Sequence, residues 1–392
     1  MRKSSRTLVA LALMLGLATL SGGAAAQSAD TQSIVIAVPV GLSGVNSVVA
    51  PAVVQSAELA VEELNAKGGI MGRPVKLMPL DDESGPAGAV KAFNTAIRQH
   101  KADVIITMET SAARNAGAPI ADRAKTLFIY TSFYEGRACG KYLYVNAWVP
   151  EQIVSPLVKF MTNEKKVKKW FVLGSDYAFG RGLIEPAKKT IKELGGTILG
   201  EEYQPLQQSD WTAIISKIRA ANPDGIMYAT SGGGPNIDFM KQFKAAGLKM
   251  PVGSLSIDEL TAEQGGNAAE GVYYTADYFT SIDNPENKTF LEAMKKKFGA
   301  NLKTPNSLSE PEYDGIQAYA MAVEKAKSTD ADKVAAVLAT IVFKGPRGAV
   351  QMNKQHHAPL PVYLAQVQAD GKTKIIQSFG LVDPGNQCPN LK

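Results

Sequence analysis

Residues 63–74 have the sequence ELNAKGGIMGRP, in which three of the twelve positions are glycine. A glycine-rich loop can cradle a phosphate, but a P-loop needs GxxxxGK[ST] and a dinucleotide site needs GxGxxG directly after a strand. Neither pattern occurs in this stretch or at Gly232, Gly233 and Gly234. Gly68 instead follows the last apolar turn of a predicted helix, where a positive φ is favoured, and Pro74 prevents continuation. The stretch therefore predicts a helix end that leads into a strand.

Outward from this stretch, short β-branched runs alternate with amphipathic segments. Residues 51–65 show the helical period, with Val54, Ala57, Val61 and Leu64 at spacings of three and four. Such alternation predicts parallel sheets with crossover helices. The first series comprises strands at 34–38, 75–80, 103–108 and 127–130, with helices over 51–65, 87–99 and 112–124.

The same alternation starts again at residue 169. Its strands are expected at 169–174, 197–203, 225–230, 251–256 and 271–278, with helices ending at Leu194, Ala221 and Ala246. Helices over 286–298, 311–327 and 330–339 follow, and then strands near 361–368 and 373–379. Two such series predict two α/β lobes joined by several short crossings, since no low-complexity linker separates them. We expect lobe 1 to comprise residues 30–147 and 279–342, and lobe 2 to comprise 148–278 and 343–385.

The first 26 residues have the pattern of a secretory signal peptide. Arg2, Lys3 and Arg6 precede an apolar run over 8–20, and the small residues at 24–26 fit a cleavage site near Ala26. A membrane anchor would need about 20 uninterrupted apolar residues. We therefore expect an exported protein that is soluble in the periplasm.

Charge and cysteine content narrow the class further. The formal net charge of +5 falls to +2 when the three basic residues of the signal are removed, so nothing favours nucleic acid as a partner. The chain has two cysteines, Cys139 and Cys388, and export would place both in a compartment that permits disulfides. A bridge between them is the first expectation, and two unrelated thiols are the alternative.

Extended to ELNAKGGIMGRPVKLMPLDDES, the opening stretch resembles type I periplasmic binding proteins of the leucine/isoleucine/valine class. The likeness covers most of the chain after the signal. Further matching motifs are GLSG (41–44), ETSAARNAG (109–117), YTSFYEGRAC (130–139) and GSDYAFGRG (174–182). Residues 279–299 and 310–326 are more similar to the branch that binds urea and short-chain amides. Gly180 stands where that branch usually has proline.

The resemblance implies an α/β fold of the two-lobed Venus-flytrap type, in which each lobe is a mainly parallel sheet flanked by helices. It implies a protein that captures a small polar solute between the lobes and hands it to the membrane subunits of an ABC permease, without a cofactor or metal. A branched-chain or related amino acid is the expected solute, with urea or a short-chain amide as the alternative. A non-transport amide sensor shares the fold, but the signal peptide argues against it.

Ligands of open α/β sheets lie beyond the carboxyl ends of the strands, close to helix N-termini. The motifs place there the candidate ligand-binding residues Ser111, Ala112, Tyr130, Ser132, Phe133, Tyr177, Phe179, Ser231 and Asp258. Ser111 could bind a carboxylate, cap a helix, or do both. By resemblance, Tyr177 and Phe179 close over the ligand, although Phe179 could also be core. Asp258 could accept an α-ammonium group or cap the helix that follows.

An enzyme is the main rival from another class. The chain has only three histidines, no GxSxG elbow and no Cys/His spacing that suits zinc. These observations favour a binding protein that has no catalytic residues.

Overall fold

The computed structural model describes residues 32–206 and 208–391, so the predicted signal peptide lies outside the described residues. Helix α1 (Ala50–Ala66) shows how the opening stretch folds. Gly68 and Gly69 follow it with φ of 94° and 82°, and the Gly69 amide donates to the Leu64 carbonyl at 2.9 Å. A Cβ on Gly69 would lie 1.9 Å from the Arg73 carbonyl oxygen. The predicted helix end is confirmed, and strand β2 (Val75–Asp81) follows it.

The first sheet is fully parallel, with strand order β2-β1-β3-β4-β5. Besides β2 it contains β1 (Ile34–Val40), β3 (Val104–Thr107), β4 (Leu127–Tyr130) and β5 (Leu143–Val145). Alternate side chains pack on opposite faces, so Ile36 and Ala37 belong to separate hydrophobic clusters. The flanking helices are α1, α2 (Pro86–Asn94), α3 (Ser111–Ala124), α9 (Pro285–Phe298), α10 (Glu310–Ala326) and α11 (Ala331–Leu338).

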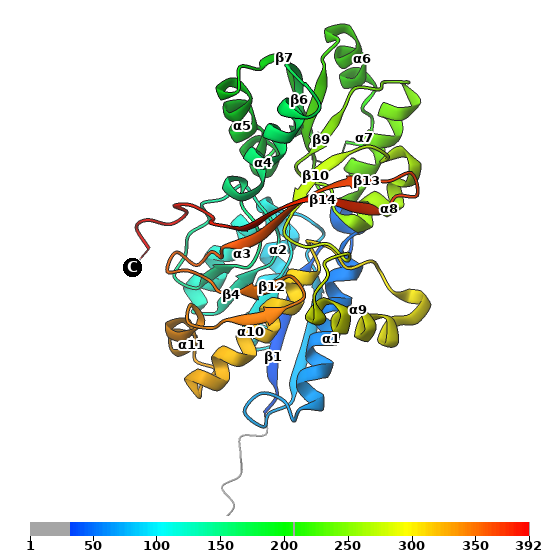
Figure 1. Ribbon diagram of the computed structural model, residues 1–392. Coiled ribbons are helices and arrows are strands. Elements are labelled where there is room, and N and C mark those ends of the chain that lie inside the picture. The colour runs from blue at the N-terminus through cyan, green and yellow to red at the C-terminus, as the bar shows by residue number, and fades with distance from the viewer. Residues whose placement is uncertain (1–31, 207, 392) are drawn as a thin grey trace, which may run out of the picture. The chain divides into compact units, whose positions relative to one another are not determined.

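The second sheet has the order β14-β13-β10-β9-β8-β6-β7, and its last two strands in sequence are antiparallel. Its strands are β6 (Lys169–Ser175), β7 (Thr197–Gln204), β8 (Gly225–Ala229), β9 (Val252–Ser254), β10 (Tyr273–Ala276), β13 (Leu360–Val367) and β14 (Thr373–Val382). Its helices are α4 (Pro150–Asn163), α5 (Ala178–Glu193), α6 (Thr212–Ala221), α7 (Gly233–Ala245) and α8 (Glu259–Gly265). Figure 1 shows these elements grouped apart from β1, α1, α9 and α10. The predicted two-lobed α/β fold is confirmed, while the residue boundaries of the lobes stay a prediction.

Three short segments connect the two sheets, at residues 146–149, 277–284 and 351–359. The hairpin of β11 (Phe343–Gly345) and β12 (Gly348–Val350) precedes the third segment and contacts α9 and α10. This hairpin was not predicted from the sequence because each of its strands has only three residues.

A buried ion network holds the connecting segments together. Arg347, in the turn of the hairpin, donates to Asn146 Oδ1 at 2.7 Å and to Asp314 Oδ2 at 2.9 Å, and it also pairs with Asp277 and Glu310. The side chains of Arg347, Asp277 and Glu310 are fully buried. Asn146 and Asp277 lie in two different connecting segments, so a single guanidinium joins both to α10.

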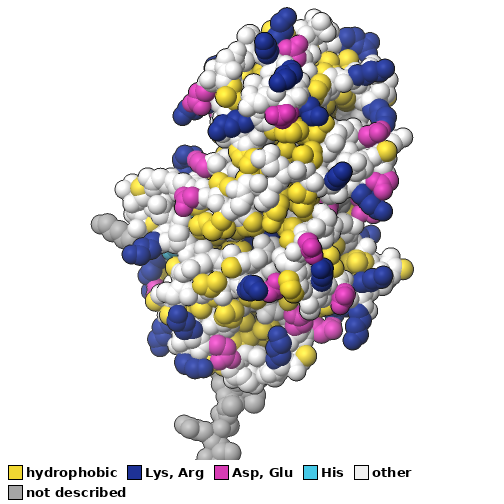
Figure 2. All heavy atoms as spheres, in the orientation of Figure 1, with side chains coloured by type: hydrophobic (Ala, Val, Ile, Leu, Met, Phe, Trp, Pro, Cys, Tyr) yellow, Lys and Arg dark blue, Asp and Glu magenta, His cyan; other side chains and the backbone are white. Residues whose placement is uncertain are grey.

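Cys139 and Cys388 form a disulfide that ties the C-terminal segment to the loop after β4, with their Cα atoms 5.7 Å apart. Lys/Arg and Asp/Glu side chains are scattered over the face shown in Figure 2, with no large patch of one sign. This distribution fits the small net charge expected after signal removal. Among the described helices, none combines the length and apolarity that a membrane span needs.

Candidate functional site

A small cavity of about 30 Å³ lies between the carboxyl ends of strands from the two sheets. The first lobe lines it with Asn46, Met108, Glu109, Thr110, Ser111, Ser132 and Phe133. The second lobe contributes Tyr177, Phe179, Thr230, Ser231, Gly232 and Ser256, and Leu308 lies just before α10. By volume the cavity holds about two water molecules in this conformation. A larger solute does not fit unless the residues that line the cavity move apart.

Six of the nine predicted ligand-binding residues line this cavity, namely Ser111, Ser132, Phe133, Tyr177, Phe179 and Ser231. Ala112, Tyr130 and Asp258 are not among its lining residues. Tyr130 is fully buried beneath the site, and its hydroxyl donates to the Glu109 carbonyl at 2.7 Å. Asp258 caps α8: its Oδ1 accepts from the Thr261 amide at 3.0 Å and its Oδ2 from the Thr261 hydroxyl at 2.6 Å. The structure thus gives Asp258 the helix-cap role that the sequence left open.

Eight further residues line the cavity that were not predicted from the sequence, namely Asn46, Met108, Glu109, Thr110, Thr230, Gly232, Ser256 and Leu308. Glu109 and Thr110 directly follow a predicted strand, and Thr230 and Ser256 end two others. The strand-end rule that selected Ser111 could have selected these four as well. Asn46 and Leu308 reach the cavity only through tertiary packing, so no local pattern marks them.

The first-lobe wall begins at the N-terminus of α3. The Thr110 side chain caps this helix by accepting from the Ala113 amide at 3.1 Å. The Ser111 hydroxyl donates to a carboxylate oxygen of Glu135, whose other oxygen pairs with Arg114 at 2.6 Å. The Arg114 side chain is only 3% exposed, and its Cζ lies 4.5 Å from the ring centroid of Tyr134. Ser111, Arg114 and Glu135 therefore form a closed polar network at the edge of the cavity.

Glu109 also lines the cavity but is not part of the network of Ser111, Arg114 and Glu135. The residue is 1% exposed, and neither carboxyl oxygen meets a donor among the residues that the structure describes other than the neighbouring carboxyl of Asp82. Burial raises the pKa of Glu109 well above its ordinary value, and the neighbouring carboxyl of Asp82 raises it further. Burial and the Asp82 carboxyl therefore both favour the neutral form of Glu109.

The second-lobe wall is built from hydroxyl groups at strand ends. The Thr230 amide donates to Ser256 Oγ at 3.0 Å, and the Ser231 amide donates to Ser175 Oγ at 2.9 Å. These bonds fix the backbone after β8. Within the described chain, the hydroxyls of Thr230 and Ser231 themselves have no partner, although both are buried. They are free to bond a group that enters the cavity.

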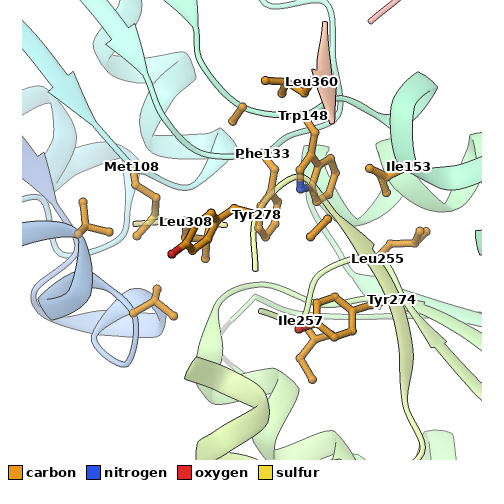
Figure 3. Close-up of a cluster of buried hydrophobic side chains, with 14 of the residues drawn as sticks. Met108, Phe133, Trp148, Ile153, Leu255, Ile257, Tyr274, Tyr278, Leu308 and Leu360 are labelled. Atoms are coloured by element: carbon orange, nitrogen blue, oxygen red, sulfur yellow. The ribbon is translucent and has the colours of Figure 1, made fainter. Parts of the chain in front are cut away.

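Aromatic rings form the apolar side of the cavity. Phe133 stacks on Trp148 with ring centroids 4.3 Å apart, and Figure 3 shows this pair in the same buried cluster as Tyr278 and Leu308. Phe179, from the second lobe, lies 5.9 Å from the ring of Phe133. Tyr177 lies 6.0 Å from Phe179, and burial raises the pKa of its phenol. Aromatic rings from both lobes thus lie side by side and can cover an apolar group in the cavity.

Comparison with known proteins agrees with this architecture. The family model described as "Periplasmic binding protein" matches residues 33–372. The Leu/Ile/Val-binding protein homolog 6 of Brucella melitensis is 29% identical over 62% of this chain, and this chain spans only 65% of that relative's length. The Pseudomonas aeruginosa protein that binds leucine, isoleucine, valine, threonine and alanine is 27% identical, over 88% of this chain and 91% of its own.

A solved structure shows the same fold. The leucine-binding protein LivK of Thermotoga maritima superposes with a TM-score of 0.79 at 26% sequence identity, covering 90% of this chain and 99% of its own. The family model covers most of the 392 residues, and both predicted sheets are present. The chain belongs to the periplasmic binding protein family.

Proposed function

We propose that this protein captures a branched-chain or related amino acid in the cavity between its lobes and delivers it to an ABC permease in the membrane. The proposal rests above all on one observation. Buried polar groups of both lobes, the Thr230 and Ser231 hydroxyls and the Glu109 carboxyl, line one cavity. The hydroxyls lack partners in the described chain, and the carboxyl meets only that of Asp82. Buried groups of this kind cost free energy unless a ligand satisfies them.

The other groups that line the cavity suit the carboxylate and the side chain of an amino acid. The N-terminus of α3 favours a carboxylate, since a helix N-terminus carries partial positive charge. The rings of Phe133, Tyr177 and Phe179 offer an apolar surface for an aliphatic side chain. The names of the relatives support the same class of solute.

Export to the periplasm and the absence of catalysis form part of this proposal. The predicted signal peptide would direct the chain through the membrane, and cleavage would leave the protein beginning near Gln27. We infer that the protein binds its solute and releases it chemically unchanged.

Thermal-shift screening followed by calorimetry tests the proposed solute. Leucine, valine, urea and acetamide should be offered to protein that has been unfolded and refolded to remove any co-purified ligand. We expect leucine or valine to raise the melting temperature, since a solute at 100 times its Kd stabilises by about 2.7 kcal/mol. Binding of urea or acetamide, with no response to any amino acid, would instead support the amide alternative.

A further inference from the structure

Glu109 occupies an unusual position for an acid. It lies in the short loop between β3, which ends at Thr107, and α3, which begins at Ser111, and it lines the cavity. It is 1% exposed, and neither carboxyl oxygen meets a donor among the described residues other than the neighbouring carboxyl of Asp82. Leaving a buried polar group unsatisfied costs about 1–3 kcal/mol, and more for a charged group. A solute that donates to Glu109 would recover this free energy.

The groups that face Glu109 do not neutralise it. Asp82, which follows β2, is fully buried; its Oδ1 accepts from the Ser84 amide at 2.8 Å, and its carboxyl interacts directly with that of Glu109. Glu312 on α10 adds a further carboxyl. Arg114 on α3 is the cation that acts on Glu109, but its guanidinium is paired with Glu135.

Asp82 and Glu109 therefore form a carboxyl pair with no cation of its own. Two such groups cannot both ionise at little cost, so the pair retains one proton near neutral pH. An ammonium group could take the place of that proton, because it supplies both positive charge and N–H donors.

On the second lobe, the alternative acid is already occupied. Both carboxylate oxygens of Asp258 accept from Thr261, and Asp258 does not line the cavity. An acceptor for a nitrogen group of the solute is thus available on the first lobe, from Glu109.

We propose that Glu109 selects solutes that carry an N–H donor, above all an ammonium group, and that the Asp82–Glu109 pair releases its proton when such a solute binds. This inference rests on the proposed function, since it assigns the solute's nitrogen to one residue. In the binding step, the carboxyl proton passes to the buffer, and an ammonium N–H bonds to the carboxylate that remains. A nitrogen-free carboxylate would meet the acid pair without a donor and is rejected.

Leucine and 4-methylpentanoate test this inference, because they differ only in the amino group. Calorimetry of the wild type with both probes should show leucine bound at least tenfold more tightly. Titrations near pH 6 in two buffers of different ionisation enthalpy should reveal release of protons with leucine. Leucine affinity should also rise between pH 5 and pH 8, because a higher pH removes the proton that the ammonium must displace.

Glu109→Gln provides the matched variant. Glutamine has the shape of the neutral acid, so the variant should fold, and its thermal unfolding provides the check. We expect leucine affinity to fall at least tenfold, the preference over 4-methylpentanoate to shrink, and the proton release to disappear. Asp258→Asn, on the other lobe, should keep both the preference and the proton release.

The outcomes separate this inference from the proposed function. Leucine binding without proton release in the wild type, and with unchanged affinity in Glu109→Gln, would overturn the role of Glu109 and leave the amino-acid proposal intact. Binding of acetamide in place of leucine, weakened by Glu109→Gln, would overturn the amino acid and support Glu109 as an acceptor. Equal affinity of the wild type for leucine and 4-methylpentanoate would contradict the selection we propose.

Discussion

Among the contacts between the two lobes, those at the connecting segments and those across the cavity differ in their chemistry. At the connecting segments, Arg347 joins Asn146, Asp277 and Asp314 through fully buried hydrogen bonds. Across the cavity, the first turn of α7 lies against residues 44–48, and the structure shows no hydrogen bond between 44–48 and 230–236. Breaking a buried ion network costs much free energy. The contact between residues 44–48 and 230–236, which we call the seam, has no hydrogen bonds to break, so separating it costs less. We infer that the first contact acts as a fixed hinge and that the second is the edge that opens.

Glycine makes the seam close-fitting. Gly232 has a φ of 52°, and a Cβ there would lie 2.6 Å from the Val45 carbonyl oxygen. A Cβ on Gly233 would lie 2.6 Å from Val48 Cβ. The second lobe can approach the first this closely only because both residues lack a side chain.

The largest effect is expected when the fixed contact is broken. Arg347→Met leaves Asp277 and Asp314 buried without their cation, which should cost about 3–5 kcal/mol of unfolding free energy. Urea unfolding measures this loss. Lys344→Ala in the same hairpin removes an ion pair with Glu286 in which the lysine is 69% exposed, and it should cost no more than about 1 kcal/mol. Equal losses in the two variants would refute the contrast between buried and exposed pairs.

A second prediction concerns an acid on α10 that lacks such a cation. Burial raises the pKa of Glu312 to about 8, although its Oε2 accepts from the Thr131 hydroxyl at 2.6 Å. The folded state therefore holds a proton that the unfolded state releases near pH 4.5. The unfolding free energy should fall as pH rises between about 4.5 and 8, with about 1.4 kcal/mol for each unit of pKa shift. Urea unfolding of Glu312→Gln over this range should show a flatter profile, and an unchanged profile would contradict the assignment.

A third prediction tests the seam that opens. Gly232→Ala should lower solute affinity at least tenfold, or about 1.4 kcal/mol, because the added methyl group keeps the lobes apart. Gly234→Ala, in the first turn of α7, is the control, since a Cβ there meets nothing within 4 Å. Calorimetry with leucine should show unchanged affinity for the control. Similar losses in both variants would indicate damage to α7 and not to closure.

The smallest expected effects come from two serine hydroxyls, one that we expect to bind the solute and one that supports the fold. Ser231→Ala removes a hydroxyl that has no partner in the described chain, so stability should hold while affinity falls by about 1 kcal/mol. Ser175→Ala removes the acceptor for the Ser231 amide and should instead lower stability by about 1 kcal/mol. Paired measurements of melting temperature and leucine affinity distinguish the two. The reverse pattern would show that the hydroxyl of Ser231 serves the fold.

The predictability of these features follows from how local their causes are. The helix end at Gly68, the parallel strands and the strand-end residues Ser111 and Ser231 follow from patterns within a few residues. The role of Asp258 could not be decided in advance, because a carboxylate before a helix can face a ligand or cap that helix. Only the position of Thr261 in the folded chain decides between them.

The partners that a residue contacts over a long distance in the chain could not be predicted from the sequence. Arg347 bonds residues that are 33, 70 and 201 positions away, and its three-residue strands carry no clear period. Glu109 had a local signal, since it follows a strand, but its isolation from cations depends on the pairing of Arg114 with Glu135. Burial and the choice of partner are properties of the whole fold.

Closure of the lobes around a solute is the central claim, and small-angle scattering tests it most directly. Refolded, ligand-free wild type and Gly232→Ala should be measured with and without saturating leucine, with saturation established by calorimetry. We expect the radius of gyration of the wild type to fall on binding, because groups of both lobes must surround the solute. The fall should be smaller or absent in Gly232→Ala. An unchanged radius of gyration in saturated wild type would contradict capture by closure of the two lobes.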